Sequence, residues 1–455
     1  MGTGPLDDLG AGFRGAVARD PEALARAGRD GSHLVGRPAA VVAPRDVDDV
    51  VALVKWARRH RTALVARGAG TSLDGESVPS EGSVVVDLSG WSSVFEVRAD
   101  ERWARVGPGV VNRSLQEVLE REGQFFPPNP GSWATSTIGG HVGTNASGPR
   151  SFKYGPTRAW VRGLRAVLGT GEEVRLGSRA AKRSVGPDLL PLIVGSEGTL
   201  GIVTEITVGT APLPGIRRGL VLPLPGDLSL GRIAAALRAA REPGLSAVEY
   251  LDAACARDLA ERRGVRWPDG DPVLLLEIEA DGAAAADAAE ERLREVLRSV
   301  GVAGAPQRHD DANRLWTERG ESSRVLDERY GERIREDVCV PLPAIDALVG
   351  VIGEIAGRER VSVVLFGHLG EGSLHPNFLV DPAGPAAERI RAALFAASLR
   401  LGGTISGEHG IGSLKVPYLA DELGPGAVRL LRAVKRACDP DGILNPGKLY
   451  PPEPP

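Results

Sequence analysis

A chain of 455 residues is longer than one hydrophobic core usually supports, so two domains are expected. Hydrophobic residues make up 42% and charged residues 25% of the chain, which are ordinary values for a globular protein. The 55 basic and 59 acidic side chains give a net charge of -4, which argues against nucleic acid as a partner because that binding needs a basic stripe.

The predicted first domain begins at residue 37 and alternates short strands with helices. In DVDDVVALVKWARRH, residues 46–60, valines recur at helical spacing and Asp46 stands where an N-cap is expected. A loop, a turn and a strand are expected in VGSEGTLGIVTEIT. Between these segments the pattern predicts strands at 62–68, 83–89 and 102–109, and a helix at 112–121. We therefore expect an α+β domain over residues 37–211.

The pattern changes after Thr210 and predicts a second domain over residues 212–400. GLVLPL, SAVEYLD, PVLLLEIEA and VSVVLFGH are typical of strands, and apolar residues predict helices around 293–300 and 345–355. Strands that alternate with helices indicate a sheet covered by helices. Residues 401–455 form a separate C-terminal segment.

Three glycine-rich loops of the first domain favour a cofactor site. They are RGAGTS (67–72), PNPGSWATSTIGGHVGTNASG (128–148) and GSEGTLG (195–201). Any one of them is more simply a tight turn, but together they suit a large phosphate-bearing cofactor held against backbone N–H groups. No GxGxxG opens a βαβ unit, which argues against a Rossmann site, and GILNPGKL lacks the hydroxyl residue of a phosphate-binding loop.

Two histidines in FGHLGEGSLHPN, His368 and His375, are candidate metal ligands. The glycines around them allow the backbone to bend so that two imidazoles converge. SGEHG supplies a carboxylate, Glu408, beside a further histidine, His409. Two histidines and one carboxylate, with a position left for water or substrate, are the pattern of a catalytic divalent metal. Spacing alone leaves this interpretation evenly balanced against ordinary packing, and the same set could hold Fe(II).

Several of these segments together resemble a known family. They are AGTSLDGESVP, VVVDLS, VGPGV, FPPNPGSWATSTIGGHVGTNASG, YGPT, VGSEGTLGIVTEIT, GHLGEGSLHPN, SGEHGIG and LNPGKLY. In this order they resemble the FAD-linked D-2-hydroxyacid dehydrogenases, a branch of the p-cresol methylhydroxylase and vanillyl-alcohol oxidase flavoproteins that includes the glycolate oxidase catalytic subunit. The resemblance implies a two-lobed FAD-binding domain, an antiparallel-sheet-and-helix substrate (cap) domain, and a C-terminal segment that returns to the FAD domain and completes the active site.

The resemblance also implies the cofactor contacts. Thr71 stands where some relatives attach the flavin to a histidine, so FAD is expected to be non-covalent. Pro187 replaces a tyrosine that the family usually has, which leaves that local contact undefined. By motif position, the expected FAD contacts are Arg67, Gly68, Gly70, Thr71, Ser72, Pro130, Gly131, Ser132, Thr137, Gly139, Gly140, Gly143, Asn145, Glu197, Gly198 and Ile202.

For the substrate, the resemblance implies oxidation of a small D-2-hydroxy acid, of the glycolate, D-lactate or D-2-hydroxyglutarate type, to the 2-oxo acid with hydride passing to flavin N5. Zinc, or Mn, Co or Fe, is then expected on His368, His375 and Glu408, and His409 is the expected base for the substrate hydroxyl proton. The family's GDGNLH is GEGSLH here, so Glu371 and Ser373 depart from it outside the proposed ligands. The residues expected to bind substrate are Arg319, Ser323, Arg335 and Asn377, of which Ser323 and Arg335 replace the family's threonine and lysine.

Two alternatives and the partners remain open. A non-redox flavoenzyme related to ether-lipid (alkylglycerone-phosphate) synthase uses the same fold, and a non-catalytic FAD-binding subunit of an oxidase complex should lack the His368, His375 and Glu408 set. The acceptor of the flavin electrons is oxygen, a quinone, a cytochrome or a separate iron–sulfur protein, and a homodimer is compatible with the resemblance.

Cysteine usage and hydropathy indicate the compartment. Cys255, Cys339 and Cys438 are widely separated and form no CxxC, which fits neither a disulfide framework nor a self-contained iron–sulfur cluster. No apolar run approaches the roughly 20 residues of a membrane span. We expect a cytoplasmic protein, at most peripheral to the inner membrane through an electron-acceptor partner.

Overall fold

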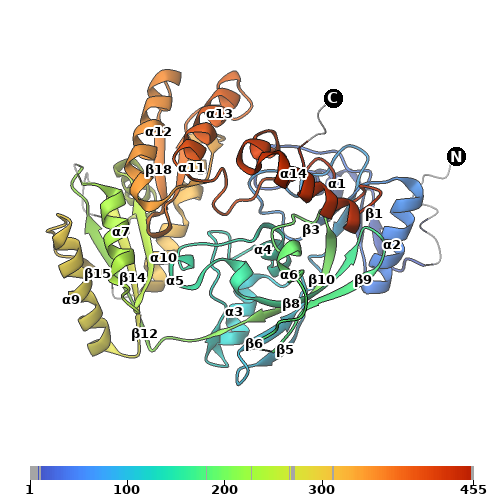
Figure 1. The fold of residues 1–455 in the computed structure, drawn as a ribbon, viewed down its shortest axis with the longest axis horizontal. Coiled ribbons are helices and arrows are strands. Elements are labelled where there is room, and N and C mark those ends of the chain that lie inside the picture. The colour runs from blue at the N-terminus through green and yellow to red at the C-terminus, as the bar shows by residue number, and fades with distance from the viewer. Residues whose placement is uncertain are drawn as a thin grey trace. The chain divides into compact units, whose positions relative to one another are not determined.

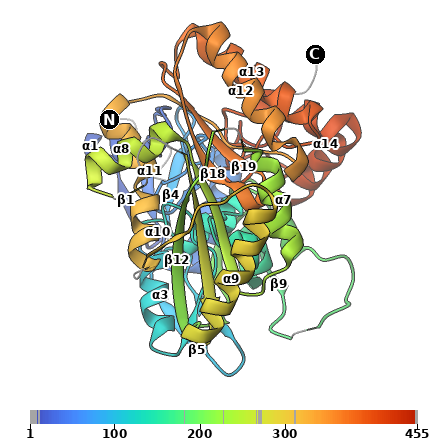
Figure 2. The ribbon, with the colours of Figure 1, turned by 90° about the vertical axis from the view of Figure 1, so that its left-hand side faces the viewer.

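The computed structural model describes residues 9, 12–180, 182–226, 228–265, 267, 272–309 and 312–451, and Figures 1 and 2 show its ribbon. The chain divides into two compact units. Unit 1 comprises Met1–Ser147, Pro156–Pro212 and Glu408–Pro455, and unit 2 comprises Gly148–Gly155 and Leu213–Gly407. Each unit therefore contains segments that are far apart in the sequence.

One lobe of unit 1 is built on a four-stranded sheet in the order β1-β2-β4-β3. Its strands are β1 (Ala16–Ala18), β2 (Ala40–Ala43), β3 (Leu64–Arg67) and β4 (Val84–Asp87), and β4 runs parallel to both β2 and β3. Helix α1 (Pro21–Ala27) precedes β2, and α2 (Val47–His60) follows it. The Asp46 carboxylate accepts the Asp49 N–H at 3.1 Å, so the predicted N-cap is confirmed. The buried face of α2, including Val50 and Val54, packs with Val84 and Val86 of β4 in one core.

The other lobe of unit 1 is a five-stranded antiparallel sheet in the order β5-β6-β10-β8-β9. Its core joins the sheet to a helix that buries Leu115 and Leu119. The strands are β5 (Val94–Arg98), β6 (Trp103–Val106), β8 (Val161–Leu168), β9 (Glu173–Gly177) and β10 (Gly201–Gly209). The helices of this lobe and of the C-terminal segment are α3 (Asn112–Glu120), α4 (Ile138–Thr144), α6 (Leu190–Ile193) and α14 (Leu419–Cys438). Two short strands, β7 (Gln124–Phe125) and β11 (Ala211–Pro212), pair with each other.

Unit 2 is an antiparallel sheet of eight strands covered by helices, which confirms the predicted α+β class. The strand order is β15-β12-β14-β13-β18-β19-β16, with β17 also paired to β19. The strands are β12 (Ile216–Pro223), β13 (Leu245–Leu251), β14 (Val273–Ala280), β15 (Gln307–His309), β16 (Ile334–Arg335), β17 (Val338–Cys339), β18 (Val363–His368) and β19 (Ser373–Phe378). The helices are α5 (Ser151–Tyr154), α7 (Leu230–Ala240), α8 (Ala253–Arg263), α9 (Ala283–Ser299), α10 (Ala312–Gly320), α11 (Ser322–Tyr330), α12 (Ile345–Glu359) and α13 (Pro385–Arg400). Helices α7 and α9 contact each other along the sheet, as Figure 2 shows.

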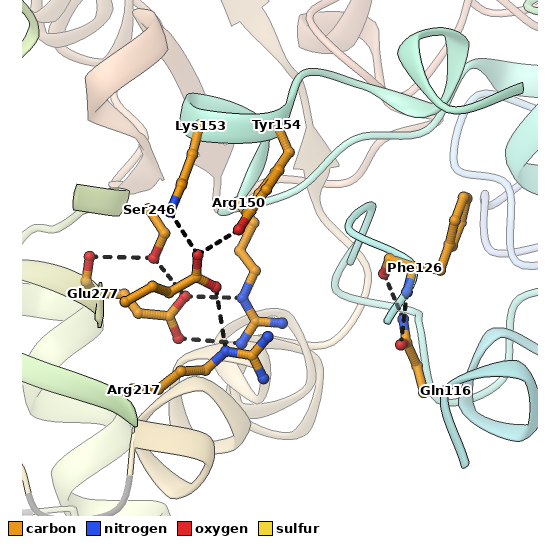
Figure 3. A network of polar contacts seen from close by, with 9 residues as sticks. Gln116, Phe126, Arg150, Lys153, Tyr154, Arg217, Ser246 and Glu277 are labelled. Carbon is orange, nitrogen blue, oxygen red and sulfur yellow. Dashed lines mark hydrogen bonds and ion pairs between the residues drawn. The ribbon is translucent and has the colours of Figure 1, made fainter. Parts of the chain in front are cut away.

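A buried charge network attaches α5 and the residue before it to the unit 2 sheet (Figure 3). Arg150 donates two hydrogen bonds, of 2.8 and 3.1 Å, to Glu277 of β14. Two positions further along the same strand, Glu279 accepts from Lys153 at 2.9 Å and from Tyr154 at 2.5 Å. Glu277 and Glu279 point to the same face of β14 because side chains alternate along a strand. These ion pairs hold Gly148–Gly155 in unit 2 although both of its flanking segments belong to unit 1.

Within the described ranges, no helix is both long and apolar enough to cross a membrane.

Candidate functional site

The three glycine-rich loops line one pocket of unit 1. The first follows β3, the second leads into α4, and the third precedes β10. The wall also includes residues that the sequence analysis did not select, among them Glu76, Ser77, Leu88 and Pro108. Of the expected FAD contacts, those that line the pocket are Arg67, Gly68, Gly70, Thr71, Ser72, Thr137, Gly139, Gly140, Gly143, Glu197 and Gly198.

Two glycines of this pocket leave no space for a side chain. A Cβ on Gly68 would lie 2.2 Å from Thr137 Oγ1, and a Cβ on Gly139 would lie 2.7 Å from the carbonyl oxygen of Pro108. Thr137 caps α4, because its Oγ1 accepts the Gly140 N–H at 3.2 Å. Gly68 of the first loop therefore packs against the Thr137 side chain and Gly139 against Pro108, and glycines, whose peptide groups no side chain covers, make up much of the pocket wall. Such a wall fits a long phosphate-bearing cofactor such as FAD.

The other expected FAD contacts do not line this pocket. Ile202 is buried in the core of the first lobe, and Asn145 ends α4 in the left-handed conformation and accepts the Arg158 N–H at 2.8 Å. Pro130, Gly131 and Ser132 form a turn in which the carbonyls of Pro130 and Ser132 accept N–H groups from residues 133, 135 and 136. Four of these five residues therefore belong to the second glycine-rich loop and its helix, whereas Ile202 belongs to β10.

A buried acidic cluster connects the pocket wall to the segment that carries His409. Glu197 accepts the N–H groups of Ile411 at 2.7 Å and Gly412 at 3.0 Å. Gly410 has φ of +96°, and a Cβ there would lie 2.6 Å from Glu76 Oε1 and 2.9 Å from Glu197 Oε1. Burial raises the pKa of Glu197 to about 7, and burial together with the neighbouring Glu197 raises the pKa of Glu76 well above its usual value. Wall residues thus fix the residues that directly follow His409.

The raised pKa of Glu197 predicts a pH dependence of stability. Folding favours its neutral form, so Glu197 stabilises the folded chain fully below its ordinary pKa of 4.5, and this stabilisation is lost as the pH rises through about 7. We expect Glu197→Gln to reduce the fall in thermal midpoint between these two pH values, because glutamine does not titrate. Thermal unfolding from pH 4 to 8 measures this, with the exposed Glu81→Gln in the same unit as the control. A wild-type and a Glu197→Gln midpoint that fall in parallel would contradict the assignment.

In unit 2, the segment with the two histidines is a β-hairpin. The sequence analysis predicted only the strand that ends at His368, whereas β18 and β19 pair antiparallel with Phe366 opposite His375 and His368 opposite Ser373. The turn closes at Gly372, with φ of +81°, where a Cβ would lie 2.0 Å from the Val340 carbonyl oxygen. Because residues two apart on a strand share a face, the register places both imidazoles on one face of the sheet. Their ring centroids lie 5.0 Å apart, and a nitrogen of each lies within 4.8 Å of the other.

A carboxylate lies behind one of the histidines. Glu249 of β13 is completely buried, and its Oε1 lies 2.6 Å from His368 Nδ1. Its Oε2 lies 2.6 Å from Arg319 Nη2 and accepts from Arg319 Nε at 2.9 Å. Arg319 is therefore a buried, paired residue, with its guanidinium 4.9 Å from the centre of the Phe366 ring. The sequence analysis missed Glu249, although a charged residue within the wholly buried strand LSAVEYL was a signal for it.

The other residues expected to bind substrate belong to a second polar network of unit 2. Asn377 is buried, accepts from Arg333 Nε at 2.9 Å and donates to the His375 carbonyl at 2.9 Å. Arg333 also donates to the Ser323 carbonyl at 3.1 Å. Arg335 pairs opposite Asn377 across β16 and β19, and its guanidinium lies 3.5 Å from Asp327. Arg333, which the sequence analysis did not select, thus connects two of the selected residues.

Glu408 and His409 are adjacent residues of unit 1. The Glu408 carboxylate accepts from Ser147 Oγ at 2.9 Å, and its other oxygen lies 4.0 Å from His409 Nε2. In unit 2, a carboxylate that was not selected from the sequence, Asp337, has an oxygen within 4.8 Å of a His375 nitrogen and accepts the Gly407 N–H at 2.5 Å. Asp337 is a further group able to bind a cation near the hairpin.

Comparisons with known families and proteins identify the family of the chain. The FAD binding domain family matches residues 38–177, and the family of FAD linked oxidases, C-terminal domain, matches residues 228–449. The chain is 35% identical to glycolate oxidase subunit GlcD of Bacillus subtilis, over 91% of this chain and 89% of the relative. It is 32% identical to a D-2-hydroxyglutarate dehydrogenase of Stutzerimonas stutzeri, over 96% of both chains, and 34% identical to a D-lactate dehydrogenase of Archaeoglobus fulgidus, over 90% of both.

Solved structures show the same fold at low sequence identity. p-Cresol methylhydroxylase superposes with a TM-score of 0.79 at 17% identity, over 95% of this chain and 93% of that one. Alkyldihydroxyacetonephosphate synthase superposes with a TM-score of 0.73, also at 17% identity, over 97% of this chain and 84% of that one. At this identity the likeness supports the fold alone, and it confirms the p-cresol methylhydroxylase type of FAD domain. The chain is an FAD-linked oxidoreductase and belongs to the FAD-linked oxidase family that contains the glycolate oxidase subunit and the D-2-hydroxyglutarate and D-lactate dehydrogenases.

Proposed function

We propose that the protein oxidises a D-2-hydroxy acid to the 2-oxo acid, with non-covalent FAD and a divalent metal as cofactors. The observation that carries this proposal is the pair of imidazoles that the β18–β19 hairpin presents on one face, with a carboxylate behind one of them. The substrates named for the three relatives support it, since glycolate, D-2-hydroxyglutarate and D-lactate share a carboxylate and a hydroxyl on adjacent carbons.

The donor atoms of unit 2 fit a metal of the zinc type. Imidazole nitrogens and carboxylate oxygens suit zinc, and also manganese, cobalt or iron. The Oγ of Ser373, which lies opposite His368 in the hairpin, is buried and has no hydrogen-bond partner among the described residues, as expected beside a site that holds a further polar group. We propose His368, His375 and Glu408 as ligands; Glu408 directly follows Gly407, whose N–H is bound by Asp337. When bound, the metal would lower the pKa of a coordinated hydroxyl group.

The chain's own residues then supply proton transfer and orientation. His409 removes the hydroxyl proton of the substrate, because a neutral imidazole nitrogen can accept a proton and release it again. Bound FAD supplies the acceptor for the hydride. Arg335 and Ser323 bind the substrate, and Asn377 orients it. The ion pair with Glu249 uses Arg319 Nε and Nη2, so the substrate carboxylate is expected at Nη1.

Reoxidation of the flavin completes the proposal. The electrons are expected to pass to a separate acceptor, which is oxygen, a quinone, a cytochrome or an iron–sulfur protein. Addition of each candidate acceptor to the substrate-reduced enzyme, with recovery of the oxidised flavin spectrum as the readout, identifies it.

Anaerobic reduction of the bound flavin tests the function. The metal-replete, yellow protein is mixed in turn with glycolate, D-lactate and D-2-hydroxyglutarate, with L-lactate as the stereochemical control. We expect one of the first three to bleach the visible flavin bands, and removal of the metal with a chelator to slow this reaction. A yellow protein that keeps its oxidised spectrum with all of them would overturn the proposed function.

A further inference from the structure

A chain of three buried side chains in unit 2 ends at one of the proposed metal ligands. Arg319 of α10 pairs with Glu249 of β13 at 2.6 Å, and Glu249 contacts His368 of β18 at 2.6 Å. The carboxylate is completely buried, and the side chains of Arg319 and His368 are only 9% and 6% exposed. All three groups come from one unit, so its own fold fixes their geometry.

This arrangement is costly unless it has a function. A buried carboxylate is tolerated only when it is paired and hydrogen-bonded, and an apolar residue of similar volume in the same place is often equally or more stable. The rest of β13 is buried, and Leu251 lies in the apolar core of unit 2. Packing alone therefore gives no reason for a glutamate at position 249. Its two oxygens explain why a glutamate stands there, because one contacts the Arg319 guanidinium and the other contacts the His368 imidazole.

The contact determines which ring nitrogen of His368 carries the proton. A carboxylate paired with a guanidinium only accepts hydrogen bonds, and Glu249 lies 2.6 Å from Arg319 Nη2. The facing nitrogen, Nδ1, must therefore carry the hydrogen. In the neutral ring this leaves the lone pair on Nε2, which is the form that binds a metal.

We propose that Glu249 is a positioning residue, which holds His368 in the Nδ1–H tautomer and makes its Nε2 the more basic metal ligand. The metal-binding part of this inference rests on the proposed function, whereas the tautomer part does not. Glu249 and Arg319 then act on the metal through His368. The second histidine, His375, is positioned by ring contacts. It packs on the Phe366 ring at a centroid distance of 5.4 Å and meets the His368 ring edge-on.

The first test is the tautomer of His368 in metal-free wild-type protein, measured by nitrogen NMR on histidine-labelled samples. A His368→Gln variant identifies the signal. We expect a protonated Nδ1 and an unprotonated Nε2. A His368 with its proton on Nε2 would overturn the inference without any further variant being needed.

The second test is metal affinity, measured by competition between the purified flavoprotein and a chromophoric chelator for Zn²⁺. Glu249→Gln is expected to weaken binding about 10- to 100-fold, and His375→Ala to lower the metal content far more. The control is Glu279→Gln, which changes another buried glutamate of the same sheet that pairs with Lys153 and Arg217 away from the histidines.

The outcomes separate this inference from the proposed function. A Glu249→Gln protein with wild-type affinity and a wild-type His368 tautomer would refute the positioning role. Should Glu249→Gln fail to fold, Glu249→Asp takes its place. It keeps the charge but moves the carboxylate away from His368, and the His368 tautomer and the Zn²⁺ affinity are measured on it in the same way. A wild-type protein that binds no metal would instead refute the metal in the proposed function, and the tautomer measurement would still decide the role of Glu249.

Discussion

Replacement of His409 by alanine is expected to slow flavin reduction by the hydroxy-acid substrate about 100-fold or more, which is the usual contribution of a general base. The variant should remain yellow, because the pocket is lined by other residues and the segment after His409 is fixed to Glu197 through backbone N–H groups. The alanine side chain removes the imidazole and leaves these backbone contacts in place.

Single-turnover reduction under anaerobic conditions measures this effect without interference from the acceptor. The control is His60→Ala, which removes a partly exposed histidine that stacks on Trp56 in α2. The His60→Ala control should reduce its flavin at the wild-type rate, so that only His409→Ala is slow. A retained rate would exclude His409 as the base, and a colourless His409→Ala protein would show that the residue acts in cofactor binding.

A second large effect is expected on stability, from the buried ion pair between Arg150 and Glu277. Replacement of Arg150 by methionine should lower the free energy of unfolding by about 3–5 kcal/mol, since it leaves a buried carboxylate without its main partner. Glu277 is completely buried, and its remaining hydrogen bond from Ser246 Oγ, at 2.8 Å, is a neutral one. Figure 3 shows that Arg150 is the cation directed at Glu277.

A double-mutant cycle separates the pair from its surroundings. The Arg150→Met, Glu277→Met double variant should recover much of the lost stability in urea unfolding, because it removes both charges together. Arg98→Met removes an exposed arginine that pairs with Asp100 in unit 1, and it should change little. A single variant as stable as the wild type would show that water reaches the carboxylate and that Gly148–Gly155 is held by other contacts.

The local elements were predictable from the sequence because their signals are short-range. Asp46 and the valines that follow it specify α2 within one segment, as a cap and an apolar face. The glycine loops were also recognisable from their composition, although what requires glycine at positions 68 and 139 is contact with the Thr137 side chain and with Pro108, which lie far away in the sequence. The family motifs added the flavin fold and the candidate residues, which periodicity by itself did not supply.

Other parts of the candidate site depend on contacts between residues far apart in the sequence. The convergence of His368 and His375 was attributed to flexible glycines, but the antiparallel register of β18 and β19 produces it. Pro130, Gly131 and Ser132 carry the right motif yet lie outside the pocket lining. A motif identifies the segment that belongs to a site, whereas the packing of the loops decides which of its side chains line the pocket.

The sequence by itself determined the α+β class and the positions of the glycine-rich loops, because cap residues, glycine turns and apolar periodicity act within a few residues of one another. Only the tertiary structure decided that Glu249, 119 residues before His368, lies against that imidazole. It also decided that Gly148–Gly155 belongs to unit 2. The pairing of distant strands and the neutralisation of buried charges depend on the burial of the whole sheet, and no local pattern encodes which partner a buried charge will find.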